Sequence, residues 1–201
     1  MKLLNIFMLV TIIPAVDLTA QPTNSLAGMG TANLVAQATN GQVEAILELG
    51  RRSDPAVVPI LESLDDPKYP MRIVAAAHMA LAKTGNETAF ISVARDLSSA
   101  DAQAQDEAIG KLTYIADRRA ISALAALLCE SNWRKEPKQI NSAEPEMDKV
   151  FHEPLQVLAI RALSDLVPDA PAPKTDRPGP KEIAEWQVWW QANKEKYEES
   201  R

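Results

Sequence analysis

Three segments of this chain repeat one another at a nearly constant period. Asp54, Asn86 and Asp117 occupy equivalent places in these segments and stand 32 and 31 residues apart. Each follows an Ala/Leu-rich run and precedes a second apolar run. A fixed period in this range indicates a solenoid, because one helical hairpin cannot bury its own apolar face and must stack on the next. The repeat therefore predicts an all-α fold built from stacked helical hairpins.

The junctions inside the hairpins carry helix-boundary residues. Asp54 is followed by Pro55, which suits a cap and a first helical turn, and Gly85 before Asn86 suits a left-handed helix end. A partial fourth copy covers residues 155–169, after an insertion at 131–154. The repeat region therefore spans residues 41–169. The expected helices are 41–52, a helix after Asp54, and 71–84, 87–97, 103–116 and 118–129.

The N-terminus has the layout of a secretory signal peptide over residues 1–20. A lysine at position 2 precedes an apolar run over residues 3–16, and small residues end at Ala20. That run has 14 residues, whereas a membrane-spanning helix needs roughly 20. We expect cleavage after Ala20 and a secreted or periplasmic protein that is not inserted in the membrane; an uncleaved anchor is the alternative. Residues 21–40 are expected to form a flexible leader with a short helix at 32–37.

The C-terminus combines a Pro-rich spacer at 170–180 with a last helix at 181–201. Its apolar residues form one aromatic stripe at helical spacing. The stripe consists of Ile183, Trp186, Trp189, Trp190, Asn193 and Tyr197, and the polar face expected opposite it consists of Lys181, Glu182, Glu185, Lys194 and Glu198. A terminal unit of a solenoid must close an apolar end with a helix that is polar outside, so we expect a capping helix. An aromatic ligand-binding box is the alternative.

Charge and chemistry exclude several classes of function. The formal net charge of −6 disfavours nucleic acid and anionic lipid as partners, and the pairs Arg51-Arg52 and Arg118-Arg119 are expected on a solvated face. Cys129 is expected to be a small buried hydrophobe and His78 a core or groove residue. Neither a phosphate loop nor a nucleophile-base pattern is present in the sequence, so we expect no catalytic residue, no metal and no cofactor.

The repeat pattern resembles HEAT repeats, in particular the short variety of the phycobilin lyases. The resemblance rests on an Ala/Leu-rich helix, a Gly/Ala-Asp junction and a second helix such as Arg119-Ala120-Ile121, and residues 186–194 resemble the ends of secreted bacterial HEAT-repeat proteins. It implies a right-handed, armadillo-like α/α superhelix whose default role is protein binding. HEAT-type di-iron hydroxylases need several His-Glu pairs, and this chain has only His152-Glu153. HEAT-type DNA glycosylases need a basic groove, and a bilin lyase acts inside the cell.

The insertion carries the candidate binding residues. Trp133 and Arg134 open it and Phe151 closes it, and aromatic and arginine side chains are enriched at binding hot spots. Alternatively, the two aromatic residues anchor the loop on neighbouring repeats. We expect a non-catalytic scaffold or adaptor that binds a protein or peptide, or else an exported ligand-binding or accessory subunit of an envelope enzyme. A deep polar pocket around His78 would favour a ligand, and a shallow open face would favour a protein.

Overall fold

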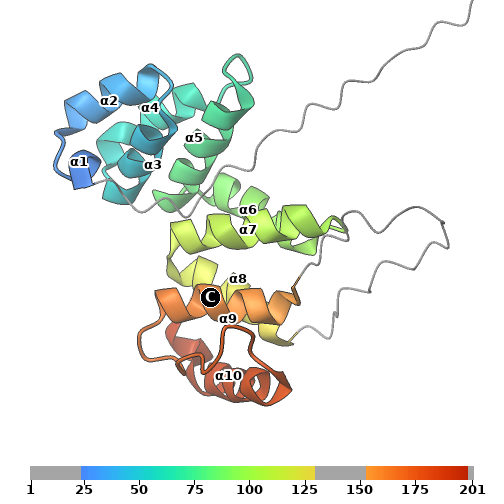
Figure 1. Cartoon of the computed structure of the whole chain (residues 1–201). Coiled ribbons are helices and arrows are strands. Elements are labelled where there is room, and N and C mark those ends of the chain that lie inside the picture. The colour runs from blue at the N-terminus through green and yellow to red at the C-terminus, as the bar shows by residue number, and fades with distance from the viewer. Residues whose placement is uncertain (1–23, 130–152, 199–201) are drawn as a thin grey trace, which may run out of the picture.

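The structure, a computed structural model, describes residues 24–129 and 153–198, and every regular element in these residues is helical. The α-helices are α1 (Asn24–Ala27), α2 (Thr31–Thr39), α3 (Val43–Arg52), α4 (Val58–Leu64), α5 (Met71–Lys83), α6 (Glu87–Arg95), α7 (Ala102–Ile115), α8 (Arg118–Cys129), α9 (Leu155–Leu166) and α10 (Pro180–Asn193). Short 3-10 helices are η1 (Pro55–Val57), η2 (Asp96–Ser98) and η3 (Lys194–Lys196). Figure 1 shows α1 to α5 gathered at one end of the molecule and α8 to α10 at the other. None of the described helices is long and apolar enough to cross a membrane.

The three repeat anchors have the same local structure. The side chains of Asp54, Asn86 and Asp117 each accept a hydrogen bond from a backbone N–H two or three residues later, at 2.9, 3.0 and 2.9 Å. The residue before each anchor has a positive φ, at 50° for Ser53, 100° for Gly85 and 55° for Ala116. A left-handed residue ends one helix, and the anchor then caps the next. The predicted junctions are thereby confirmed at the level of backbone and caps.

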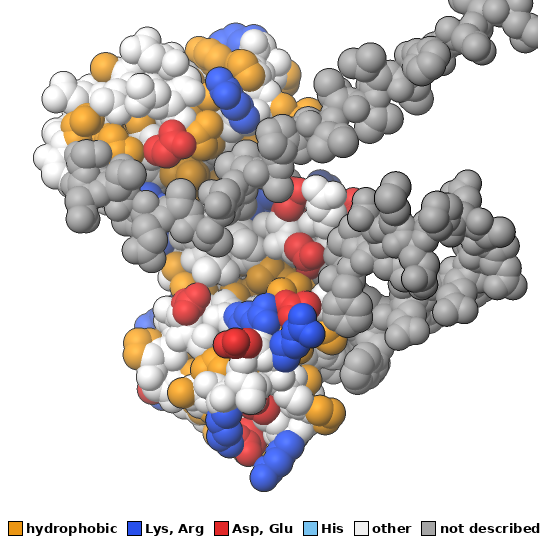
Figure 2. Space-filling view, in the orientation of Figure 1, with side chains coloured by type: hydrophobic (Ala, Val, Ile, Leu, Met, Phe, Trp, Pro, Cys, Tyr) orange, Lys and Arg blue, Asp and Glu red, His pale blue; other side chains and the backbone are white. Residues whose placement is uncertain are grey.

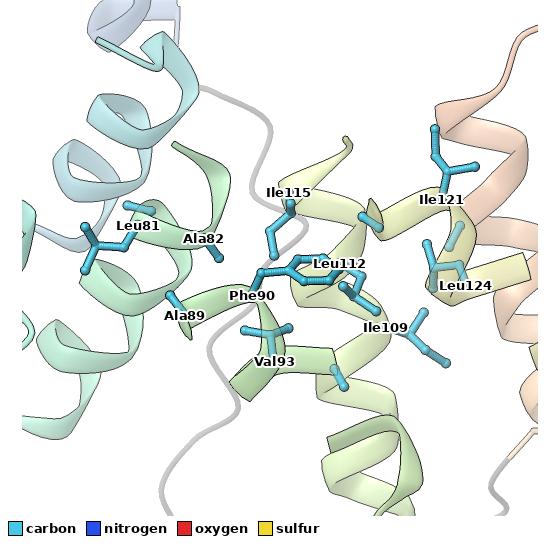
Figure 3. Packing of buried hydrophobic residues seen from close by; sticks show 14 of the residues in the cluster. Leu81, Ala82, Ala89, Phe90, Val93, Ile109, Leu112, Ile115, Ile121 and Leu124 are labelled. Carbon is cyan, nitrogen blue, oxygen red and sulfur yellow. The ribbon is translucent and has the colours of Figure 1, made fainter. Parts of the chain in front are cut away.

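The core is formed between hairpins as well as within them. Helix α3 packs on α5, α5 on α7 and α7 on α9, and α8 also packs on α9. Figure 3 shows Phe90 of α6 lying beside Leu112 and Ile115 of α7. Because these helices bury their apolar faces against helices of neighbouring hairpins, no single hairpin buries its apolar side chains by itself.

Helices α3 and α5 approach so closely that a glycine is required between them. A Cβ added at Gly50 would lie 2.8 Å from Cα of Ala80 and 2.4 Å from the hydroxyl oxygen of Tyr114. That hydroxyl donates a 2.6 Å hydrogen bond to the carbonyl of Leu47, which ties α7 to α3. Burial raises the pKa of Tyr114 well above its ordinary value, so the phenol stays a hydrogen-bond donor in alkaline solution as well as at neutral pH.

The predicted leader differs from what the structure contains. Residues 31–39 form α2, which is longer than the expected helix at 32–37 and packs on α3 through the fully buried Leu34 and Ala38. Arg52 of α3, whose guanidinium also bonds Glu48 one turn earlier, holds the start of this leader by donating to the carbonyls of Leu26 and Ala27 in α1. The prediction that the Arg51-Arg52 pair only faces solvent is therefore wrong for Arg52.

The predicted aromatic stripe forms a cluster of α10 with Tyr197, and α10 packs against α8 and α9. The expected helix at 181–201 is too long, because α10 ends at Asn193 and Tyr197 follows the short η3. Trp186 is fully buried, Trp190 is nearly so, and the Trp189 and Trp190 rings lie 6.4 and 6.0 Å from that of Tyr197. Gln187 donates a 2.6 Å hydrogen bond to the carbonyl of Leu128 at the end of α8. One residue of the expected polar face is misplaced.

Glu182 is buried instead of facing solvent. Its carboxylate accepts a 2.6 Å hydrogen bond from the backbone N–H of Lys174, which holds the loop before α10 against the helix. A buried carboxylate is tolerated where donors meet it, and the helical pattern alone could not show that the loop supplies one.

The junction geometry predicts opposite effects of two matched substitutions. A left-handed conformation costs a non-glycine residue about 1–2 kcal/mol of strain. Glycine avoids this strain but loses more backbone entropy on folding, which offsets part of its advantage. Gly85→Ala should lower the free energy of unfolding by about 0.5–1 kcal/mol, although open space surrounds its Cβ position. Ala116→Gly should raise it by about 0.5–1 kcal/mol. Chemical denaturation checks both values, and changes of the same sign would contradict the shared junction.

Candidate functional site

The predicted binding residues Trp133, Arg134 and Phe151 lie outside the described residues, so their role stays a prediction. The structure does correct the expectation for Cys129, at the end of α8. Its side chain is exposed rather than buried, and Gln191 of α10 lies 3.9 Å from its sulfur. The apolar run ends at Leu128, so the thiol falls on the side of the helix that faces solvent.

A hollow of about 290 Å³ lies where α5, α6, η2 and α7 meet. It is partly open to solvent. Its apolar lining comes from Met71, Val74, Ala75 and Met79 of α5 and Val93 of α6, and its polar lining from Asp65, His78, Ser92, Asp96 and Lys111. The site therefore combines an apolar floor with charged groups at its edge.

A second hollow of about 190 Å³ adjoins the first. Both are lined by Asp65 and His78, so these two residues separate them. The second hollow adds Glu62 of α4 together with Asn86 and Thr88, which belong to the α5–α6 junction and the start of α6. Together the two form one shallow track, called here the α5–α6 track.

His78 and Asp65 form a fixed pair in the middle of this track. Nδ1 of His78 lies 2.9 Å from Oδ2 of Asp65, which directly follows α4. A carboxylate only accepts hydrogen bonds, so Nδ1 carries the proton, and Nε2 is buried without a partner in the part of the chain that the structure describes. Ser92 lines the first hollow but is not bonded to Nε2. The pair therefore holds the imidazole in place and does not form a Ser-His relay among the described residues.

The far edge of the track carries a loose ion pair. Nζ of Lys111 on α7 lies 3.7 Å from Oδ2 of Asp96, whose side chain is 39% exposed. With Glu62 and Asp65, three carboxylates and one ammonium group line the track among the described residues. Carboxylates therefore outnumber ammonium groups along the track, and Asp96 has exposed surface that a further cation could contact.

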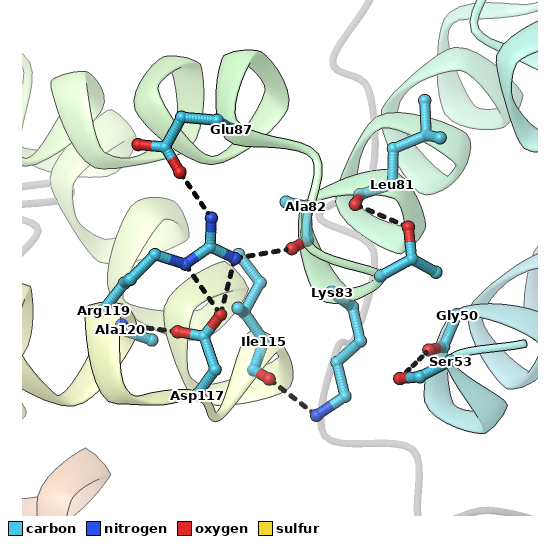
Figure 4. Close-up of polar contacts among 11 residues, drawn as sticks. Gly50, Ser53, Leu81, Ala82, Lys83, Glu87, Ile115, Asp117, Arg119 and Ala120 are labelled. Carbon is cyan, nitrogen blue, oxygen red and sulfur yellow. Dashed lines mark hydrogen bonds and ion pairs between the residues drawn. The ribbon is translucent and has the colours of Figure 1, made fainter. Parts of the chain in front are cut away.

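Two basic side chains hold the walls of the track in place. Nζ of Lys83, at the end of α5, donates a 2.6 Å hydrogen bond to the carbonyl of Ile115 at the end of α7. Burial lowers the pKa of Lys83, and this is only partly offset by Asp117. Figure 4 shows this contact beside Arg119, which bonds Asp117, Glu87 and the carbonyl of Ala82. The solvated face predicted for Arg118-Arg119 is therefore wrong for Arg119.

The charge pattern elsewhere is mixed. Figure 2 shows basic side chains interspersed with acidic ones over α9 and α10 on the face that it displays. Among the described residues, no group of three or more His, Cys, Asp and Glu side chains is placed to hold a metal ion.

Sequence reasoning named His78 as a core or groove residue but missed Asp65, Met71, Asp96 and Lys111. One sequence signal could have pointed to the site. Residues 71–84 are apolar on nearly every side, so an exposed stretch of this helix would be unusual.

Comparison with protein-family models, with curated proteins and with solved structures found no match to this chain. The resemblance to HEAT repeats therefore rests on the residues of the chain itself.

The geometry at His78 predicts one tautomer. The ring should be protonated at Nδ1, because the Asp65 carboxylate accepts there and no described residue accepts from Nε2. Long-range ¹H–¹⁵N NMR distinguishes the two nitrogens. Asp65→Ala should remove the preference, whereas Asp65→Asn should keep it through its amide oxygen; a dominant Nε2–H form in the unaltered protein would contradict the assignment.

Proposed function

We propose that this protein is a non-catalytic adaptor, and that the α5–α6 track is the surface that binds a protein or peptide partner. The observation that carries the proposal is the exposure of a large apolar side chain that lines the track. Met71 is 75% exposed and lines the first hollow, and Ile91 of α6, although it lines neither hollow, adds a second exposed apolar side chain at 57%. Exposed apolar side chains around a recess are typical of interaction surfaces.

The shape of the track favours a protein partner over a small ligand. Small-molecule sites usually enclose about 300–1,000 Å³ and bury most of the ligand. The hollows, at about 290 and 190 Å³, fall at or below this range and are open. A ligand-binding or accessory subunit of an envelope enzyme is the second candidate, favoured only by the fixed His78–Asp65 pair.

The proposal includes the architecture of the HEAT resemblance. A right-handed superhelix of HEAT-like hairpins accounts for the packing of α3, α5, α7 and α9 in succession and for the matching junctions at Asp54, Asn86 and Asp117. In this arrangement α10 is the second helix of the last pair. With Trp186 buried beneath it, α10 is proposed to cap the end of the stack.

We further propose export, with removal of residues 1–20 as a signal peptide. The protein isolated from its own cells should then begin at Gln21 and lie in the secreted or periplasmic fraction. N-terminal sequencing after fractionation checks both points. A protein that retains Met1 or Lys2 in the cytoplasmic fraction would refute the proposal of export.

The adaptor proposal predicts that partner capture depends on Met71. The full chain with a C-terminal tag is expressed in its own organism, and captured proteins are identified from the unaltered form and from Met71→Glu. A specific partner should be lost with Met71→Glu, because the change puts a carboxylate at an apolar contact. With the purified partner, the affinity should fall about tenfold, which equals about 1.4 kcal/mol.

Val188→Glu is the matched control. Val188 is 71% exposed on α10, away from the track. Its substitution introduces the same carboxylate and removes an apolar side chain of similar exposure. If both substitutions reduce capture equally, or if neither reduces it, the α5–α6 track is not the docking surface. Thermal unfolding of each variant shows that the fold is intact.

A further inference from the structure

We propose that the occupant of the α5–α6 track is a linear peptide segment in which an apolar side chain stands beside lysine or arginine. This inference rests on the adaptor function proposed above and names the chemistry of the partner.

The apolar half of the recognition comes from α5 and α6. Met79 and Val93 are almost fully buried and form a fixed floor, whereas Met71 at the first turn of α5 is mostly exposed. An unbranched thioether adapts its rotamers to the shape placed against it. A fixed floor with one adaptable wall suits a single apolar side chain that enters from solvent.

The charges at the edge select the neighbours of that side chain. Among the described residues that line the track, the carboxylates of Glu62, Asp65 and Asp96 outnumber the ammonium group of Lys111, and Asp65 also holds the His78 ring. The chain as a whole has a net charge of −6, which adds to the attraction for a basic segment during encounter. A cationic side chain on either side of the apolar anchor would therefore be favoured and an acidic one repelled.

The two carboxylates nearest the first hollow can each take part without loss of their present role. Asp65 bonds His78 through Oδ2, so its second oxygen remains an acceptor site. Asp96 pairs with Lys111 at 3.7 Å, longer than a good charge-assisted hydrogen bond of about 2.7–2.9 Å. A basic side chain of the peptide thus competes with a weak partner.

Two synthetic peptide arrays test the proposal on the full chain. In the first, each hexapeptide has Leu, Ile, Met or Phe between two lysines or arginines; in the second, glutamate replaces every basic residue. Binding is measured by fluorescence anisotropy and mapped by the ¹³C-methyl signals of Met71 and Met79. We expect the best basic peptides to bind at least about tenfold more tightly than their acidic counterparts, to shift both methyl signals and to weaken as salt is added.

Charge variants provide the matched controls. Asp65→Asn with Asp96→Asn should weaken binding of the basic peptides about three- to tenfold, while the amide oxygen at position 65 still accepts from His78. Lys111→Gln should strengthen it about threefold, because a competing cation is removed. Asp165→Asn, an exposed carboxylate of α9 outside both hollows, should leave it unchanged.

The outcomes separate this inference from the adaptor function. Equal binding of the acidic array, or unaltered binding by the double variant, overturns the selection for a basic segment. If neither array shifts the methyl signals while partner capture still depends on Met71, the peptide inference is wrong and the docking surface stands. If partner capture is also unaffected by Met71→Glu, the peptide inference and the docking surface are both wrong.

Discussion

The Arg119 guanidinium joins two successive helix junctions of this fold. Its side chain, only 16% exposed, bonds Asp117 at the α7–α8 junction, Glu87 at the start of α6 and the carbonyl of Ala82 near the end of α5. It also lies 4.4 Å from the centre of the Phe90 ring. Burial would lower the pKa of Arg119, but its hydrogen bonds to Asp117 and Glu87 outweigh this and raise it. One permanent charge therefore links two consecutive junctions and sets the spacing of the helices that line the track.

Local features of the fold could be predicted from the sequence, and contacts between distant segments could not. The caps at Asp54, Asn86 and Asp117 depend on residues within three positions, so their pattern is visible in the chain. The burial of Arg119 depends on Glu87, which lies 32 residues earlier in the chain. The burial of Glu182 depends on the backbone N–H of Lys174 in the loop before α10. Such partners are brought together only by packing, and the ordinary preference of charged residues for solvent then misleads.

The candidate site was predictable to the same limited extent. The apolar character of residues 71–84 placed His78 in the core or a groove, and the structure puts it between two hollows. A carboxylate in a turn is ordinarily hydrated, yet Asp65 is the partner of His78 because the turn between α4 and α5 returns it to the helix. Lys111 reaches the track from α7. The periodicity of the sequence does not show which side chains of distant helices meet there. Pairing across helices is thus the information that a single sequence lacks.

The uneven packing of α5 explains why a docking surface would lie on this helix. On one side its backbone approaches α3 so closely that Gly50 has no room for a Cβ beside Ala80. On the other, Met71 and Ala75 remain exposed although the helix is apolar nearly all round. A helix of that composition is ordinarily covered on every face. Stability comes from the tightly packed side, so the apolar side chains on the open side have no role in the packing seen here, and contact with a partner would bury them.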